Sequence, residues 1–373
     1  MMRRLLVAGA LALGLVVSAA APATAADWQV VQPGKTRPIT RLIGVTALNA
    51  TSAWAVGEEA VGLSAPGFPL IMRWDGTQWT KVTTSLRWQG RLTSVSVESA
   101  RQAWAIGQDT GLNQHVLRWN GKAWREVAFP GQDESGVQLS RVRSAGGETW
   151  IVGATGTGVP LALRWTSGGF VRLPDVIATG GLSGVQIRGV SDVWVSGFTA
   201  RVGGGSIGLV AHWDGTAWQV LPTPPSCIFT GVSDVFATTA SDVWGGGGCR
   251  GVGTISPVNP LLVHWDGTAW TQPTVPIQFG SLNTIAPDDQ GRPRWISHTA
   301  FNLVPPAQAQ YLSYDGQAWT LVPGPAVAGQ SLETMQVAHV PGTDATWAVG
   351  SAAVSGGSVP RIELIGSLAA PTG

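Results

Sequence analysis

Apolar residues alternate with small or polar residues over short stretches of this chain. The second occurrence of the pattern is representative: residues 92–97, 103–107, 115–119 and 122–127 each combine β-branched or aromatic residues with period-two alternation. Such runs, bounded by turn-forming residues, predict half-buried β-strands. Because groups of four of these runs follow one another along most of the chain, we expect an all-β protein.

A short phrase links the third and fourth strand of each group: an aromatic residue, Asp-Gly or Asn-Gly, two more residues and an aromatic residue. A unit that recurs every 45–52 residues indicates a repeat architecture. Asp-Gly also predicts a two-residue type I′ hairpin, in which Trp74 would face Thr77 and Met72 would face Trp79. The phrase begins at Trp74, Trp119, Trp213, Trp265 and Tyr314.

Tryptophan marks equivalent positions in the repeats. The second strand carries Trp54, Trp104, Trp150, Trp194, Trp244, Trp295 and Trp347. The fourth strand carries Trp79, Trp124, Phe170, Trp218, Trp270 and Trp319, one fewer. Trp28 supplies the missing aromatic, so we expect the strand around it to pair with the last strand, near Ile362. The sequence therefore predicts a seven-bladed β-propeller of four-stranded antiparallel blades, closed by the N-terminal strand joining the last blade.

The first 25 residues have the character of a secretory signal peptide. Arg3 and Arg4 precede an apolar run over residues 5–17, and small residues at 23–25 offer a cleavage site near Ala25. We expect residues 1–25 to be removed and residues 26–373 to form a single β-propeller domain that is secreted. No later run of 18 apolar residues predicts membrane insertion.

Charge and composition limit the classes of partner that the protein is expected to bind. Charged residues make up only 12% of the chain, which contains 50 Gly, 24 Pro and 19 Trp. Removal of the signal peptide leaves 21 basic and 22 acidic residues, a net charge of −1. A near-neutral surface without basic runs argues against nucleic acid as a partner. We expect a monomer that needs no cofactor and holds no metal.

The repeated phrases resemble those of known propellers. Residues 54–57 (Trp-Ala-Val-Gly) and 264–270 (His-Trp-Asp-Gly-Thr-Ala-Trp) are similar to repeats of secreted bacterial propellers. They also resemble kelch-type repeats and the Asp-box hairpins of sialidase-type propellers. Some secreted propellers with Trp-rich repeats are sugar-binding lectins, so the resemblance implies carbohydrate binding without indicating a residue for it.

The two cysteines, Cys227 and Cys249, come just before the first strand and just after the second strand of the fifth repeat. These two ends of an antiparallel pair lie on the same side, so an exported protein is expected to join them in a disulfide.

Repetition stops in the loops between the second and third strands. These loops share one face of a propeller with the connections between repeats, and varied loops on a rigid scaffold are typical binding sites. Trp88, which lies outside the repeated positions, is a further contact candidate. The predicted ligand-binding residues are Glu58, Gln108, Asp109, Arg201, Arg250, His298 and Trp88.

These features favour a non-catalytic binding protein whose loop-rich face holds a glycan or an extracellular protein. A propeller-type glycoside hydrolase or lyase is an alternative, because Glu58, Glu59 and Asp109 could provide the two carboxylates that glycoside hydrolysis uses. A structural or assembly role in the cell envelope is a third possibility. No pattern of catalytic residues stands out.

Overall fold

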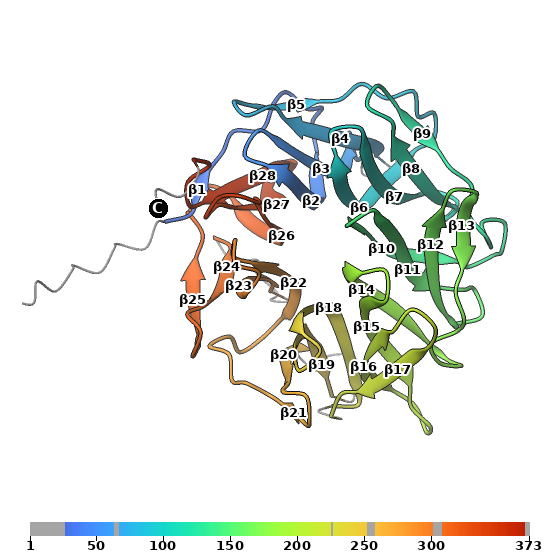
Figure 1. Cartoon of the computed structure of the whole chain (residues 1–373). Helices are drawn as coiled ribbons and strands as arrows, with labels where there is room; N and C mark the ends of the chain where they lie inside the picture. Colours follow the sequence, from blue (N-terminus) through green and yellow to red (C-terminus); the bar gives the residue numbers. More distant parts are fainter. Residues whose placement is uncertain (1–26, 63–66, 225–226, 252–257, 301–307, 370–373) are drawn as a thin grey trace, which may run out of the picture.

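The protein is an all-β propeller built of four-stranded antiparallel blades. The computed structural model describes residues 27–62, 67–224, 227–251, 258–300 and 308–369, so the predicted signal peptide lies outside the described residues. Strands surround a central axis in chain order (Figure 1). They form five four-stranded sheets and one eight-stranded sheet, within the described residues.

The first three sheets follow the order of the repeats. The first sheet contains β2 (Arg41–Asn49), β3 (Ser52–Glu59), β4 (Phe68–Trp74) and β5 (Trp79–Lys81). The next contains β6 (Gly90–Ser99), β7 (Gln102–Asp109), β8 (Gln114–Trp119) and β9 (Trp124–Glu126). The third contains β10 (Gln138–Ala145), β11 (Glu148–Ala154), β12 (Pro160–Thr166) and β13 (Gly169–Arg172).

The eight-stranded sheet has two parts. One comprises β14 (Gly180–Gly189), β15 (Asp192–Ala200), β16 (Ser206–Trp213) and β17 (Trp218–Pro222). The other comprises β18 (Phe229–Thr239), β19 (Asp242–Arg250), β20 (Val258–Trp265) and β21 (Trp270–Thr271). A single parallel pairing, Ser206 with Phe229, joins β16 to β18.

The last two sheets complete the ring. One contains β22 (Ser281–Pro287), β23 (Pro293–Thr299), β24 (Gln310–Tyr314) and β25 (Trp319–Pro323). The other contains β26 (Ser331–His339), β27 (Thr346–Val354), β28 (Gly357–Ile365) and β1 (Gln29–Val30).

The N-terminal strand closes the ring, as the sequence predicts. Gln29 of β1 pairs with Leu364 of β28, and Figure 1 shows β1 beside β28. Trp28 is 3% exposed and stacks on Tyr311 of the preceding sheet, with ring centroids 4.0 Å apart. The first described strand of the chain is therefore held by the last sheet and by its neighbour.

A β-bulge interrupts each of the innermost strands β2, β6, β10, β14, β18, β22 and β26. In β2 it lies between Leu42 and Gly44, opposite Gly57 of β3. A Cβ at Gly57 would lie 1.9 Å from the carbonyl oxygen of Arg41, so only glycine fits there. The glycine of the Trp-Ala-Val-Gly phrase is thus explained by the bend that the bulge gives the inner strand.

Aromatic residues fill the interfaces between successive sheets. Trp54 of β3 packs on Trp119 and Trp124 of the next sheet, with centroids 5.2 and 5.4 Å away. The residue that pairs with Trp54 on β4, Arg73, places its guanidinium over the Trp54 ring, 5.2 Å from the centroid. His212 stacks in the same way on Trp194. Most of the repeated indoles therefore lie in the core. The Arg or His that precedes the third-strand aromatic residue packs over them.

The predicted register of the hairpin between the third and fourth strands was wrong. Trp74 pairs with Trp79 and Met72 pairs with Lys81, which leaves a four-residue turn in place of a two-residue one. Only Gly76 has a positive φ, +99°, whereas a type I′ turn needs two. Asp75 Oδ1 instead accepts hydrogen bonds from the N–H groups of Thr77 and Gln78, and this side-chain turn replaces the backbone one.

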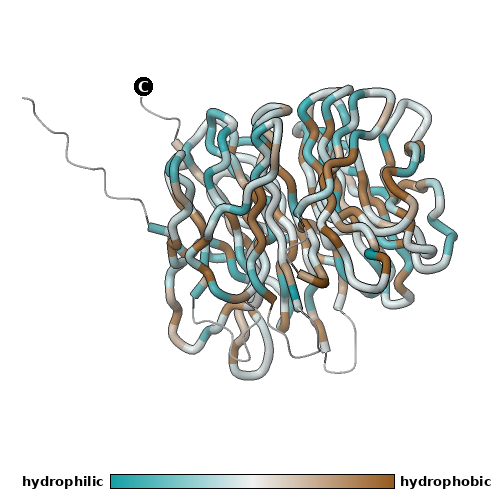
Figure 2. Tube along the Cα trace, turned by 90° about the horizontal axis from the view of Figure 1, so that it is seen from below, coloured by the Kyte–Doolittle hydropathy of each residue, from teal (hydrophilic) through white to brown (hydrophobic). Residues whose placement is uncertain are grey.

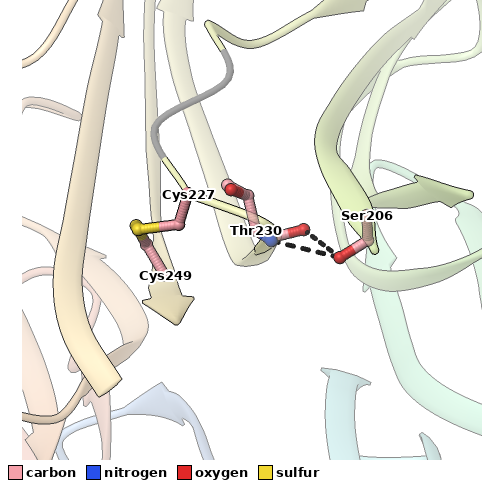
Figure 3. The surroundings of a disulfide bond; sticks show 4 residues. All are labelled: Ser206, Cys227, Thr230 and Cys249. Carbon is pink, nitrogen blue, oxygen red and sulfur yellow. Dashed lines mark hydrogen bonds between the residues drawn. A yellow bond between two sulfur atoms is a disulfide. The ribbon is translucent and has the colours of Figure 1, made fainter. Parts of the chain in front are cut away.

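The expected disulfide between Cys227 and Cys249 is present (Figure 3). It ties the segment before β18 to the end of β19. Beside it, Ser206 Oγ donates to the carbonyl oxygen of Thr230 and accepts from its N–H. Seen from the side, the ring carries its hydrophobic stretches mainly within the strands, and many hydrophilic stretches at the edges (Figure 2).

Candidate functional site

Six of the seven predicted contact residues lie at or just after the end of the second strand of their sheets, and the seventh, Trp88, lies between β5 and β6. The structure brings only Asp109 and Trp88 together in one cluster. Glu58, Gln108, Asp109, Arg250 and His298 lie in β3, β7, β19 and β23, and Arg201 follows β15. Each has partners of its own within its sheet or loop. Trp88 and Asp109 share a neighbour, His115, which sequence reasoning did not single out.

The two glutamates of β3 are enclosed by local cations. Glu58 is 7% exposed and lies 3.6 Å from the Arg41 guanidinium. Glu59 is 2% exposed, forms an ion pair with Lys81 and accepts a hydrogen bond from the N–H of Arg37. Both carboxylates therefore form ion pairs within the sheet and its entry segment.

His298 is also buried, with 5% of its surface exposed. Its Nε2 lies 2.8 Å from the carbonyl oxygen of Phe279, to which it donates. Burial lowers the pKa of His298, and the hydrogen bond to Phe279 only partly opposes this effect. The neutral imidazole occupies the position where β3, β7, β11, β15 and β19 have the glycine opposite the bulge, so its role here is internal packing.

Arg250, Arg201 and Gln108 are more accessible. The Arg250 guanidinium lies over the Phe229 ring at 5.3 Å. Arg201 is exposed and shapes a turn, because its N–H donates to the carbonyl of Gly205. Gln108 is half-buried and pairs through its backbone with Gln114 on β8.

Trp88 lies in the connection between β5 and β6 and is held from two sides. Its Nε1 donates to Glu126 Oε1 at 2.7 Å, and its indole stacks on His115 with centroids 4.2 Å apart. His115 Nδ1 lies 3.4 Å from Glu126, and its Nε2 lies 3.4 Å from Asp109. An indole, an imidazole and two carboxylates thus form one cluster at the loop-rich edge of this sheet.

A surface hollow of about 480 Å³ adjoins this cluster. We call it the Trp88 hollow. It is lined by Ser85, Leu86, Arg87, Trp88, Trp124, Arg125 and Glu126. Trp88 is half-buried, whereas Arg87, Arg125 and Glu126 are exposed. A partly apolar platform with charged donors and acceptors at its rim can hold a polar ligand that also has an apolar face.

Asp109 is ionised in this setting. Partial burial acts to raise its pKa, but hydrogen bonds from the Asn113 side chain and backbone, from His115 and from the N–H of Gly111 together hold the pKa below its ordinary value. The closest of these is the Gly111 N–H, 2.8 Å from Asp109 Oδ1. Asp109 is therefore an acceptor of hydrogen bonds rather than a donor of protons near neutral pH.

A second cavity, of about 360 Å³, lies in the centre of the ring, between the ends of the innermost strands. Arg143 of β10 lines it, together with Ser96, Gln186 and Asp234. Sequence reasoning placed the binding site in the loops and missed this cavity. The available signal was Arg141-Val142-Arg143, because no other innermost strand carries a cation at either corresponding position.

No group of three or more His, Cys, Asp or Glu residues in the described part of the chain is placed to hold a metal ion. No helix in the same residues is long and apolar enough to cross a membrane.

Comparisons with known proteins support the fold. No protein-family model matches the chain, and a search of curated proteins gives no match. Among solved structures, the chain is similar to YCF48 bound to D1 peptide (14% identity, TM-score 0.57, covering 94% of this chain and 100% of that one). It is also similar to YCF48 from Cyanidioschyzon merolae (15%, 0.56, 91% and 99%).

A third similar structure is the BP39L lectin from Burkholderia pseudomallei (12% identity, TM-score 0.56, covering 90% of this chain and 98% of that one). At these identities the likeness shows the β-propeller fold alone. The kelch-like and Asp-box-like character of the repeats stays a prediction.

Proposed function

We propose that this protein is an exported, non-catalytic binding protein that holds a glycan at the Trp88 hollow. The basic and apolar residues of the first 25 positions support export through a cleaved signal peptide. Solved propellers of similar fold include a lectin and a protein bound to a peptide, so the scaffold is compatible with either kind of ligand. The choice of a glycan rests on the Trp88 cluster.

The observation that carries the proposal is the fixed indole of Trp88 beside polar groups. A sugar ring has an apolar face of C–H groups that packs on an aromatic plane, and hydroxyls that need hydrogen-bond partners. Glu126 and the Arg87 and Arg125 side chains flank the hollow and provide such partners. Because His115 and Glu126 already hold the indole, little side-chain freedom is lost when a ligand binds.

The electrostatics of the cluster favour binding over hydrolysis. Glycoside hydrolysis requires a carboxylic acid that stays protonated through a raised pKa. The pKa of Asp109 is shifted downward, and Glu58 and Glu59 are paired with cations. These carboxylates suit hydrogen bonding to hydroxyls or structural ion pairing.

A glycan array probed with the wild-type chain, Trp88→Ala and Phe279→Ala tests the proposal. Phe279 is a matched control, since it is 46% exposed but lies in a different connection, the one between β21 and β22. We expect saturable binding to at least one glycan, a loss of about tenfold or more in Trp88→Ala, and no change in Phe279→Ala. Absence of saturable binding to any glycan, or equal binding by Trp88→Ala, would refute glycan binding at this hollow.

We also propose that the ring has seven blades. The two parts of the eight-stranded sheet are joined by one parallel pairing, and each part repeats the order and the second-strand tryptophan of the four-stranded sheets. Counted as two blades, they bring the total to seven. An experimental structure in which β14–β17 and β18–β21 are continuous across several pairings would contradict this count.

A further inference from the structure

Hydrogen bonds join neighbouring innermost strands: a side chain of one strand accepts from a backbone N–H group of the next strand around the ring. Ser96 Oγ of β6 accepts from the N–H of Ser144 on β10 at 2.8 Å. Asp234 Oδ2 of β18 accepts from Ile285 of β22 at 3.0 Å. Thr46, Ser94, Gln186 and Thr284 play the same part at their own junctions.

β10 breaks this pattern. Its register against β11 puts Arg141 and Arg143 at the positions that Ser94 and Ser96 hold in β6. A guanidinium has five N–H donors and no acceptor, so neither arginine can receive a backbone hydrogen bond from β14. The two arginines therefore stand where β2, β6, β14, β18 and β22 use acceptors, and hydrogen bonds between neighbouring strands do not explain them.

Neither arginine has an ion-pair or hydrogen-bond partner among the side chains that the structure describes. Arg141 Nε is fully buried and unpartnered, and so is the Gln336 Oε1 atom that lines the same narrow part of the channel. Burial lowers the pKa of Arg143; Asp234 partly offsets this, and Arg141 adds to it. A buried donor without an acceptor costs free energy, which an anion bound at the Arg141 guanidinium would recover.

The charged groups that line this region carry one more positive charge than negative charge. Asp234 is 2% exposed and already accepts from Ile285. His339, at the rim of the cavity, lies 3.5 Å from Asp289. Two arginines against a single aspartate favour a monoanion over a dianion such as phosphate.

The size and the walls of the cavity indicate what kind of ligand fits it. Its volume of about 360 Å³ is within the range of small-molecule sites. Val97, Val185 and Phe236 give it apolar walls, while Arg143 lines both this cavity and the narrow part that holds Arg141. The cavity therefore combines a cationic floor with an apolar surround.

We infer that the central cavity binds a carboxylate attached to a compact apolar group, with Arg143 as its main contact and Arg141 as a second donor. A guanidinium matches a carboxylate through two parallel N–H···O bonds, which a point charge could not provide. The carboxylate can belong to a free organic acid or to the C-terminus of a peptide, since both present the same group. This site is separate from the Trp88 hollow and does not depend on glycan binding.

Calorimetric titration of the mature chain with phenylacetate, with its neutral analogue phenylacetamide and with inorganic phosphate tests the inference. We expect saturable binding of phenylacetate and binding weaker by about tenfold or more for the amide and for phosphate. Acetyl-Ala-Phe with a free or an amidated C-terminus distinguishes the two sources, because tighter binding of the free-acid peptide than of phenylacetate points to a peptide terminus.

Variants locate the site. Arg143→Gln should weaken phenylacetate by about tenfold or more, whereas Arg172→Gln, at the exposed end of β13, should leave binding unchanged. The comparison of acid with amide uses the unaltered chain, so it stands even if Arg143→Gln does not fold. No carboxylate binding at all, equal affinity for acid and amide, or undiminished binding by folded Arg143→Gln would overturn the inference.

Discussion

The interfaces between sheets and the wall of the central channel are made by the same repeated strands, yet they differ in kind. At the interfaces the same aromatic arrangement recurs: Trp54, Trp104 and Trp150 each pack on two aromatic residues of the next sheet. Along the channel, the residue at one equivalent position of the innermost strands differs from strand to strand. This position is occupied by Gly44, Ser94, Arg141, Gly184, Asp234, Thr284 and Gln336.

This difference indicates which positions of the chain can differ between repeats. An interface residue touches two sheets at once, and close packing penalises any change of volume. Channel residues such as Ser94 and Thr284 are buried too, but they share one narrow space around the axis, so residues of different size can occupy this position in different strands. Repetition therefore marks stability in this molecule, and departure from repetition marks candidate binding residues.

The largest effect is expected where an interface loses its indole. Trp104 is fully buried between Trp165 and Phe170, so Trp104→Ala should lower the free energy of unfolding by about 3–5 kcal/mol. Trp88→Ala, which removes a half-buried indole outside the repeated positions, should cost distinctly less. Chemical denaturation of both variants measures the contrast, and equal losses would remove the distinction between repeated and non-repeated tryptophans.

A smaller effect is expected from a buried arginine that has its partner. Arg361 of β28 is 3% exposed and donates to Glu363 at 2.8 Å, and Glu363 also accepts from Tyr311 across the closing interface. Arg361→Ala leaves the buried carboxylate without its cation and should cost about 3 kcal/mol.

Arg143→Gln is the matched comparison for Arg361→Ala, because it removes an arginine without a described partner. Its unfolding free energy should stay close to that of the wild type or rise. A loss as large as that of Arg361→Ala would show that Arg143 is part of the structural framework of the ring.

The smallest effect concerns the turns at the outer edge. Three hydrogen bonds, from the Ala217 N–H and the Thr216 side chain and N–H, hold the pKa of Asp214 at about 2, against an ordinary value of 3.8. A depressed folded-state pKa stabilises the protein above the unfolded value, and this contribution is lost as the pH falls from about 4 to about 2. Asp214→Asn keeps the acceptor oxygen but should reduce the fall of the melting temperature over that range.

Asn120 provides the reciprocal test at an equivalent turn. It accepts from the N–H groups of Lys122 and Ala123 without a charge. Asn120→Asp should add acid sensitivity over the same pH range. Melting curves of both variants between pH 2 and pH 7 check the pair, and unchanged profiles would mean that the turns do not contribute to acid unfolding.

Much of the fold could be predicted because its signals are local. Alternation, turn residues and repeated aromatics indicate strands and their order, and the ends of paired strands brought Cys227 and Cys249 together correctly. The hairpin register was missed for a local reason as well: the Asp75 side chain builds its own turn, and Asp-Gly alone does not distinguish that turn from a type I′ turn.

The candidate site was only partly predictable, because its contacts join separate segments. Trp88 and Asp109 could be proposed one by one, but His115 connects them only after β7, β8 and the entry to β6 are assembled. Glu58 and His298 looked like loop residues, and burial against their own sheets removed them from the surface.

By itself, the sequence determined a ring of repeated β-sheets with indole-filled interfaces and an N-terminal strand that completes the last sheet. These features depend on periodicity and on residues that repeat, which a linear chain displays directly. Only the tertiary structure decided which side chains face the channel, because the bulge in each innermost strand shifts the alternation by one residue and ring closure brings distant strands together. The central cavity with Arg141 and Arg143 exists through that geometry and has no counterpart in any single segment.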